Sequence, residues 1–182
     1  EEIKDALSWL EFLVNPKNEI AFRRIINKPV RGVGSTSQEK IINEAFSLED
    51  GSSLSLLDAV LKVKLSKKAM EGAKEFYNIA TELLEYLPND LLTESIAREA
   101  MKEDESDVTG SSDENEKKLS DFIDLVSKKT GLSEYHKSQD EVSGTQREAN
   151  LQELSNSASF YKYSVQGLLD FLDSIEFDRN IE

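Results

Sequence analysis

The sequence predicts an all-α protein that forms a single multi-helix domain with a helix-hairpin-helix-like Gly-x-Gly turn. Apolar residues recur at helical spacing in several separate segments, and the clearest of them runs from Ser66 to Leu87. The chain has 182 residues, of which 38% are hydrophobic, so it can build one core of normal size. We therefore expect one domain over residues 1–182.

The first predicted helix has an apolar face and ends before Asn15-Pro16, with Trp9 in the core or at an interface. A second apolar helical pattern follows Ile20 and leads to the Gly-x-Gly turn. After the helix that starts near Ser35, a loop around Asp50-Gly51 precedes a short helix. The residues of that helix expected to face inward are Leu56, Leu57, Val60 and Leu61.

The long pattern from Ser66 to Leu87 ends at Pro88, and we expect Phe76 and Tyr77 in the core rather than as a stacking platform for bases. Further helices are predicted over Leu91–Met101, from Leu119 to a C-cap at Thr130-Gly131, over Leu132–Lys137, and as a final pair after Gly144. His136, the only histidine, has no partner in the sequence for catalysis. It is predicted to be a surface or capping residue.

The turn itself lies between Lys28 and Lys40. Pro29 should end the preceding helix near Asn27, and Gly32 and Gly34 are expected to take positive φ on either side of Val33, which tucks between the two helices. The next helix must begin at the residues of N-cap type, and two capping boxes overlap there, so the cap is left open between them. These boxes pair Ser35 with Gln38 and Thr36 with Glu39.

Unpaired backbone N–H groups at a helix N-terminus form an anion site. Between Lys17 and Lys40 there are six basic residues and two acidic ones, in a chain of net charge -14, and this local reversal favours a phosphate backbone as the anion. The alternative is an ordinary helical hairpin. The predicted phosphate-binding residues are Arg31, Gly32, Val33, Gly34, Ser35, Thr36, Ser37 and Lys40.

Residues 103–116 form an acidic insert with seven acidic residues, which we expect to be mobile because so little of it can be buried. A calcium loop is disfavoured, since Gly110 follows Asp107 by three positions where the motif needs five. The insert is open to interpretation as a partner-binding tail, an electrostatic competitor of DNA or a tolerated surface loop.

Composition excludes several kinds of function. There is no cysteine, so neither a disulfide nor a thiolate metal site is possible, which fits a reducing cytoplasm. No apolar run approaches the ~18 residues of a membrane span, and the N-terminus has no signal-peptide character. We identify no catalytic, cofactor-binding or metal-binding residue, because no nucleophile stands beside a base.

The segment Asn15 to Gly34 closely resembles the 2B subdomain of UvrD/Rep/PcrA-type superfamily 1 DNA helicases. Glu2 to Leu7 resembles the family's entry into that subdomain, and Arg147 to Leu154 resembles its R-x-x-N-L-x-E-L helix, in which Arg147 and Asn150 are expected to satisfy inter-helix groups. The resemblance implies that the chain is an excised fragment of an ATP-dependent DNA helicase. That parent would bind ATP and Mg between two RecA-like motor domains, whereas this chain contains no G-x-x-x-x-G-K-[ST] motif and no cofactor is expected in it.

Two functions follow from the resemblance and the turn. The first is an accessory, regulatory module that contacts the backbone of duplex DNA without sequence preference and tunes unwinding by the motor domains. The second is a protein-interaction or autoinhibitory docking module with little DNA affinity of its own. Bulky replacement of Gly34 is expected to abolish DNA binding in the first case.

Overall fold

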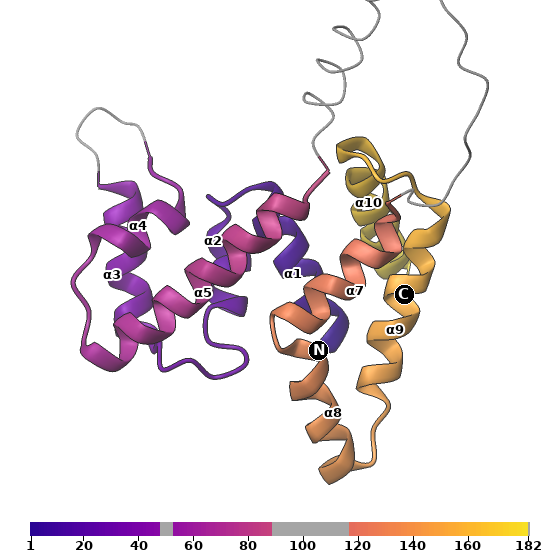
Figure 1. Ribbon diagram of the computed structural model, residues 1–182, viewed down its shortest axis with the longest axis horizontal. Helices are drawn as coiled ribbons and strands as arrows, with labels where there is room; N and C mark the ends of the chain where they lie inside the picture. The colour runs from indigo at the N-terminus through magenta and orange to yellow at the C-terminus, as the bar shows by residue number, and fades with distance from the viewer. Residues whose placement is uncertain (48–52, 89–116, 182) are drawn as a thin grey trace, which may run out of the picture.

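The computed structural model describes residues 1–47, 53–88 and 117–181, and within these ranges the regular structure is entirely helical, which confirms the predicted all-α class (Figure 1). The predicted helix Leu91–Met101, the acidic insert 103–116 and the Asp50-Gly51 loop lie outside the described residues. No described helix is long and apolar enough to cross a membrane.

In chain order, the described helices are α1 (Glu2–Val14), α2 (Glu19–Ile25), α3 (Ser35–Phe46), α4 (Leu56–Lys62), α5 (Lys67–Tyr86), α7 (Leu119–Lys129), α8 (Leu132–Ser143), α9 (Arg147–Ser157), the 3-10 helix η1 (Ala158–Phe160) and α10 (Val165–Ile181). Figure 1 shows α3 and α4 at one end of the molecule and α7 to α10 at the other, with α5 running from the first group toward the second. The long helix α5 therefore joins the two halves of the fold.

The centre of the core is a cluster of aromatic rings on α1, α2 and α5. The ring of Phe76 lies 5.0 Å from Trp9, 5.5 Å from Phe12 and 5.8 Å from Phe22, measured between centroids. All four side chains are fully buried, which confirms the core positions expected for Trp9 and Phe76. Such tilted and edge-to-face pairs add about 0.5–1.5 kcal/mol each beyond the burial of their area.

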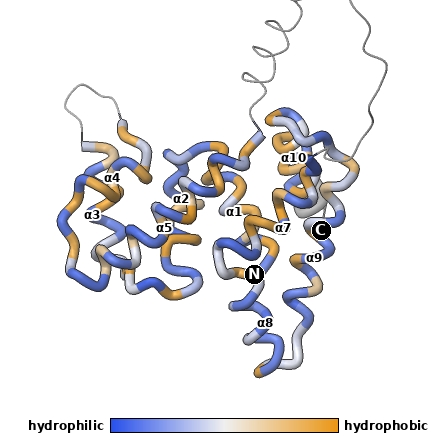
Figure 2. The backbone as a smooth tube through the Cα atoms, in the orientation of Figure 1, coloured by the Kyte–Doolittle hydropathy of each residue, from blue (hydrophilic) through white to orange (hydrophobic). Residues whose placement is uncertain are grey.

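Most predicted helix ends agree with the structure. The helix α1 ends at Val14, α5 begins after Ser66, whose side chain accepts a hydrogen bond from the Ala69 amide, and Gly131 has the positive φ of a C-cap. Hydrophobic and hydrophilic residues are interspersed along α3, α5 and α7, as they are in helices that have one apolar face (Figure 2). The inward position predicted for Leu61 is wrong, because its side chain is 55% exposed.

The prediction for His136 is also wrong. The helix α8 continues to Ser143 rather than ending near Lys137, and it buries the imidazole completely. The His136 Nε2 atom lies 3.0 Å from Oδ2 of Asp5, a carboxylate that is itself only 1% exposed. Burial lowers the pKa of His136, while the hydrogen bond to Asp5 and the charge of that carboxylate act in the opposite direction.

Candidate nucleic-acid interface

The turn between α2 and α3 is built around the side chain of Asn27. Its Oδ1 atom accepts hydrogen bonds from the amides of Arg31, at 2.8 Å, and Val33, at 3.2 Å. Gly32 has φ +80°, as predicted, and Val33 is fully buried between the helices, also as predicted. Gly34 does not have positive φ: its φ of -74° and ψ of 178° are extended, so that prediction is wrong.

Arg31 is buried rather than directed at solvent. Its Nη1 atom lies within hydrogen-bond distance of four carbonyl oxygens, those of Ile25 (3.0 Å), Ile26 (3.3 Å), Lys28 (3.2 Å) and Pro29 (3.4 Å). Its Nη2 atom donates to the Thr130 carbonyl at 2.8 Å. Burial lowers the pKa of the guanidinium, which Glu75 opposes. The side-chain charge that the sequence assigned to phosphate therefore faces the protein interior, where it fixes the turn.

The helix α5 packs directly against the turn. A Cβ atom on Gly72 would lie 1.8 Å from the carbonyl oxygen of Arg31, so only glycine permits this approach. The side chain of Lys68 lies beside Gly32, with carbon atoms 3.0 Å from the position of a Cβ there. Sequence reasoning missed both residues, because nothing local to α5 indicates that it packs against a turn some forty residues earlier.

The first turn of α3 presents its backbone amides outward. Gly34 is the N-cap, and no side chain caps the helix. Among the described residues no acceptor binds the amides of Gly34, Ser35, Thr36 and Ser37. Gly34, Ser35 and Thr36 are exposed, and Ser37 is half-buried. The helix dipole places partial positive charge at these donors, so the geometry is suited to an anion.

Neither predicted capping box forms. The Gln38 side chain donates to the Val33 carbonyl at 2.8 Å instead of reaching back to Ser35. Glu39 lies 2.7 Å from Arg23 rather than turning toward Thr36. The open choice of cap is thus resolved in favour of a glycine with no side chain, which leaves the amides available.

Much of the positive charge counted in the sequence is paired. Arg23 pairs with Glu19 and Glu39, while Arg24 and Lys28 lie 2.8 Å and 2.9 Å from the carboxylate of Asp5. Within the described part of the chain, Lys17, Arg31 and Lys40 make no ion pair, and neither does Lys68 of α5, which lies beside Gly32. Lys40, on α3 itself, and Lys68, beside Gly32, are both exposed, so they are the basic side chains available to an anion at this end of α3.

The sequence of the chain matches a known family over almost its whole length. The family model of the UvrD-like helicase C-terminal domain matches residues 1–177. This chain belongs to the UvrD-like helicase C-terminal domain family.

Relatives of this UvrD-like domain include two bacterial proteins named ATP-dependent DNA helicase PcrA. The protein from Staphylococcus epidermidis is 27% identical over 189 aligned residues, which cover the whole of this chain and 22% of that protein. The protein from Staphylococcus aureus is 38% identical over 87 residues, which cover 46% of this chain and 11% of that protein. The chain thus spans about a fifth of the length of the first of these relatives.

In this UvrD-like domain, the R-x-x-N-L-x-E-L segment forms α9. Asn150 Nδ2 donates to Glu2 Oε1 at 2.7 Å, which confirms that this asparagine joins two helices. The backbone amides of Arg147 and Glu148 are capped by the carboxylate of Asp140, whose pKa these bonds lower against the effect of desolvation. No described group of three or more His, Cys, Asp or Glu residues is placed to hold a metal ion.

Proposed function

We propose that this chain is the 2B-like accessory subdomain of a superfamily 1 DNA helicase, and that the α2–α3 turn contacts the backbone of duplex DNA. The observation that carries the proposal is the set of amides from Gly34 to Ser37 that have no acceptor among the described residues, together with Lys40 and Lys68, which make no ion pair there. Family membership supports a helicase context. ATP and Mg belong to the motor domains of the parent, and this subdomain tunes their unwinding.

In this mechanism a phosphate oxygen accepts hydrogen bonds from the amides at the start of α3, and the hydroxyls of Ser35 and Thr36 add donors. Lys40 and Lys68 contribute charge from two different helices. Because amides and lysines bind phosphates rather than base edges, the contact does not depend on sequence. The few phosphates engaged limit the dissociation constant to about 10⁻⁴ to 10⁻⁶ M at physiological salt.

Arg31 has a different role in this proposal from the one its charge suggests. Its guanidinium binds four carbonyl oxygens between Ile25 and Pro29 and the carbonyl oxygen of Thr130, and it thereby fixes the backbone from which α3 begins. The phosphate site is then formed before DNA arrives, and ordering the turn costs nothing at the moment of binding.

A second candidate function is docking onto the motor domains. It is favoured by Ile20 and Val30, which are 84% and 80% exposed although they are large apolar residues on α2 and on the turn. A docking surface buries such side chains. Replacing Val30 by Ser would weaken association with the motor domains and leave duplex affinity unchanged if both functions are present.

The test of the proposed function is an amide NMR titration of the chain with a short duplex at low salt. We expect shifts confined to residues 32–40 and to the start of α5, which diminish as salt rises. Lys40→Gln and Lys68→Gln should each reduce the slope of log affinity against log salt by about 1. Lys137→Gln is the matched control, because this lysine of α8 is exposed and makes no ion pair with any described residue. Shifts centred elsewhere would contradict the proposal.

A further inference from the structure

A second surface of the molecule combines lysines with aromatic rings. It lies where α7 begins and where η1 leads into α10, and we define the lysine–aromatic surface as Lys117, Lys118, Phe160, Lys162 and Tyr163. Figure 1 places these segments at the opposite edge of the molecule from the start of α3. The surface is therefore separate from the α2–α3 turn.

Two adjoining cavities shape this surface. One, of about 370 Å³, has Tyr86, Phe122 and Leu125 in its lining, and the other, of about 380 Å³, is lined by residues of η1 and the link to α10. They share Lys117, Lys118 and Tyr163. Cavities of this volume are at the lower end of the range that holds small organic groups such as a nucleobase with its sugar.

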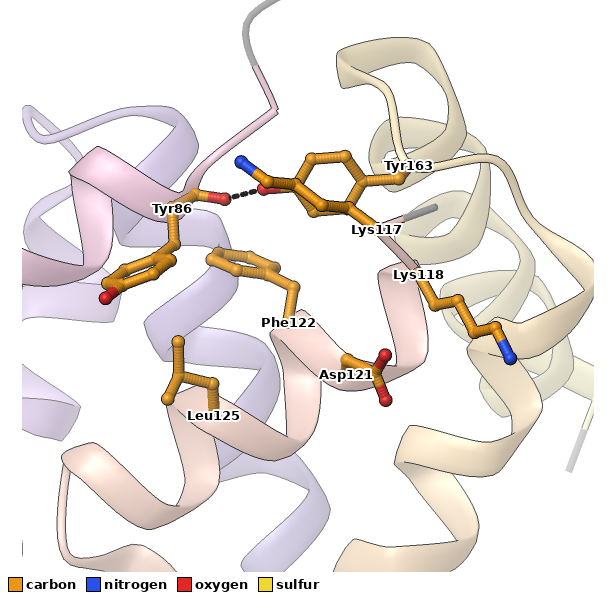
Figure 3. Close-up of a pocket in the computed structure, with 7 residues that line it drawn as sticks. All are labelled: Tyr86, Lys117, Lys118, Asp121, Phe122, Leu125 and Tyr163. Carbon is orange, nitrogen blue, oxygen red and sulfur yellow. Dashed lines mark hydrogen bonds between the residues drawn. The ribbon is translucent and has the colours of Figure 1, made fainter. Parts of the chain in front are cut away.

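The aromatic groups differ in how they are held. The Tyr163 hydroxyl donates to the Tyr86 carbonyl, and its ring packs edge-on against Phe122 with centroids 6.4 Å apart (Figure 3). Phe160, in contrast, is 89% exposed, the largest exposed fraction among the large hydrophobic residues described. A rigid ring beside a free one offers faces on which a planar group can stack.

The lysines of this surface are the second part of the site. None of Lys117, Lys118 and Lys162 makes an ion pair with a carboxylate of the described residues, and Asp121 is the one acidic residue that lines either cavity. The Lys117 Nζ atom lies 5.9 Å from the centroid of the Tyr163 ring (Figure 3). In a chain of net charge -14, three lysines that make no ion pair among the described residues lie around one exposed ring, Phe160, and one half-buried ring, Tyr163. They form a local site for an anion that also has a π-face.

We propose that the lysine–aromatic surface binds single-stranded DNA, with a base stacked on Phe160 and the adjacent phosphates held by Lys117, Lys118 and Lys162. Stacking on a protein ring requires a base face that is not already covered, which favours a single strand over a duplex. The contact is independent of the phosphate site at the α3 start. The domain would then have one binding site for the duplex and another for a separated strand.

Fluorescence anisotropy of a labelled oligothymidylate of about 16 nucleotides, titrated with the full 182-residue chain at low salt, tests the proposal. Phe160→Ala should weaken binding about fivefold or more, since stacking on one ring contributes that much. Phe160→Trp should bind as tightly as the parent chain, because it keeps an aromatic ring. Phe160→Leu, which keeps apolar area without a ring, should bind as weakly as Phe160→Ala. Val142→Ala, at a side chain 85% exposed on α8, is the matched control and should leave binding within twofold.

Two further variants test the contribution of lysine charge and the independence of this surface from the start of α3. Lys162→Gln should reduce the salt slope by about 0.7, the value for one phosphate of a single strand. Gly34→Asp should leave oligothymidylate binding unchanged, so that failure of the duplex site and failure of this one are distinguishable. Retention of full affinity by Phe160→Ala would overturn the proposal. A polyglutamate peptide that binds as tightly, with the same loss in Phe160→Ala, would overturn it in favour of an acidic protein partner.

Discussion

Replacing Gly34 by Asp should stabilise the protein and weaken its binding to duplex DNA. Gly34 is the N-cap of α3, its φ is negative, and a Cβ atom there meets nothing within 4 Å, so the substitution fits without strain. The new carboxylate would accept hydrogen bonds from the amides of Thr36 or Ser37, which the described residues leave without an acceptor. It would therefore occupy the donors that we assign to phosphate.

The two effects have opposite signs and separate magnitudes. An Asp cap gains a few tenths of a kcal/mol over Gly, and its charge at the helix N-terminus adds about 0.3–1 kcal/mol. Together these raise the melting temperature by about 1–4 °C for a protein of this size. Loss of a hydrogen bond to a charged group costs about 1.5–3 kcal/mol, so duplex affinity should fall by about tenfold or more.

The assays are a thermal melt followed by circular dichroism and fluorescence anisotropy with a labelled duplex of about 20 base pairs at low salt. Gln152→Glu makes the same change of charge on the exposed face of α9 and should alter affinity less than twofold. A Gly34→Asp protein that melts higher and binds duplex as tightly as the parent chain would refute the α3 amides as a phosphate site. An equal loss of duplex affinity in both variants would show that the effect comes from net charge and not from the α3 amides.

Two further predictions concern the support of the turn. Arg31→Met should lower the free energy of unfolding by about 2 kcal/mol or more, because buried carbonyls lose their donor, and Arg31→Lys should have an intermediate effect. Urea unfolding measures both variants, and an unchanged midpoint would contradict the role assigned to Arg31. Stability should also fall as pH drops below about 6.5, since the unfolded state then binds a proton that the lowered pKa of His136 keeps off the folded state. His136→Gln should flatten this dependence of the unfolding free energy, and equal slopes in the two proteins would exclude the imidazole as its cause.

The helices were predictable from local pattern, and the exceptions have physical causes. Apolar spacing identified the elements from α1 to α10 that lie in the described ranges, because burial of one helical face is a short-range property of the sequence. Leu61 and His136 were assigned wrongly because burial depends on which neighbour covers a position. His136 is paired with a carboxylate more than a hundred residues earlier in the chain, and no pattern around position 136 indicates it.

The site was predictable in its backbone and not in its side chains. Pro29, Gly32 and the hydroxyl residues after Gly34 located the turn and the start of α3 correctly. The sequence could not show that Arg31 would satisfy carbonyls rather than phosphates, nor that Lys68 would lie beside Gly32. Counting charge along a segment treats every basic residue as free, whereas ion pairs across the fold remove several of them.

The buried charges around the turn are best explained by positioning rather than by stability. Taking a guanidinium or a carboxylate out of water costs several kcal/mol, which its hydrogen bonds must offset before they add to stability. Arg31 instead ties the turn to the end of α2 and to Thr130 after α7. Asp5 ties α1 to Arg24 on α2, to Lys28 in the turn and to His136 on α8. Hydrogen bonds made by charged groups are short and directional, so this arrangement fixes the position of the turn relative to α1, α7 and α8. A backbone site whose donors are amides has no side-chain flexibility with which to adjust to a phosphate, and it therefore needs a turn that is held in place before DNA binds.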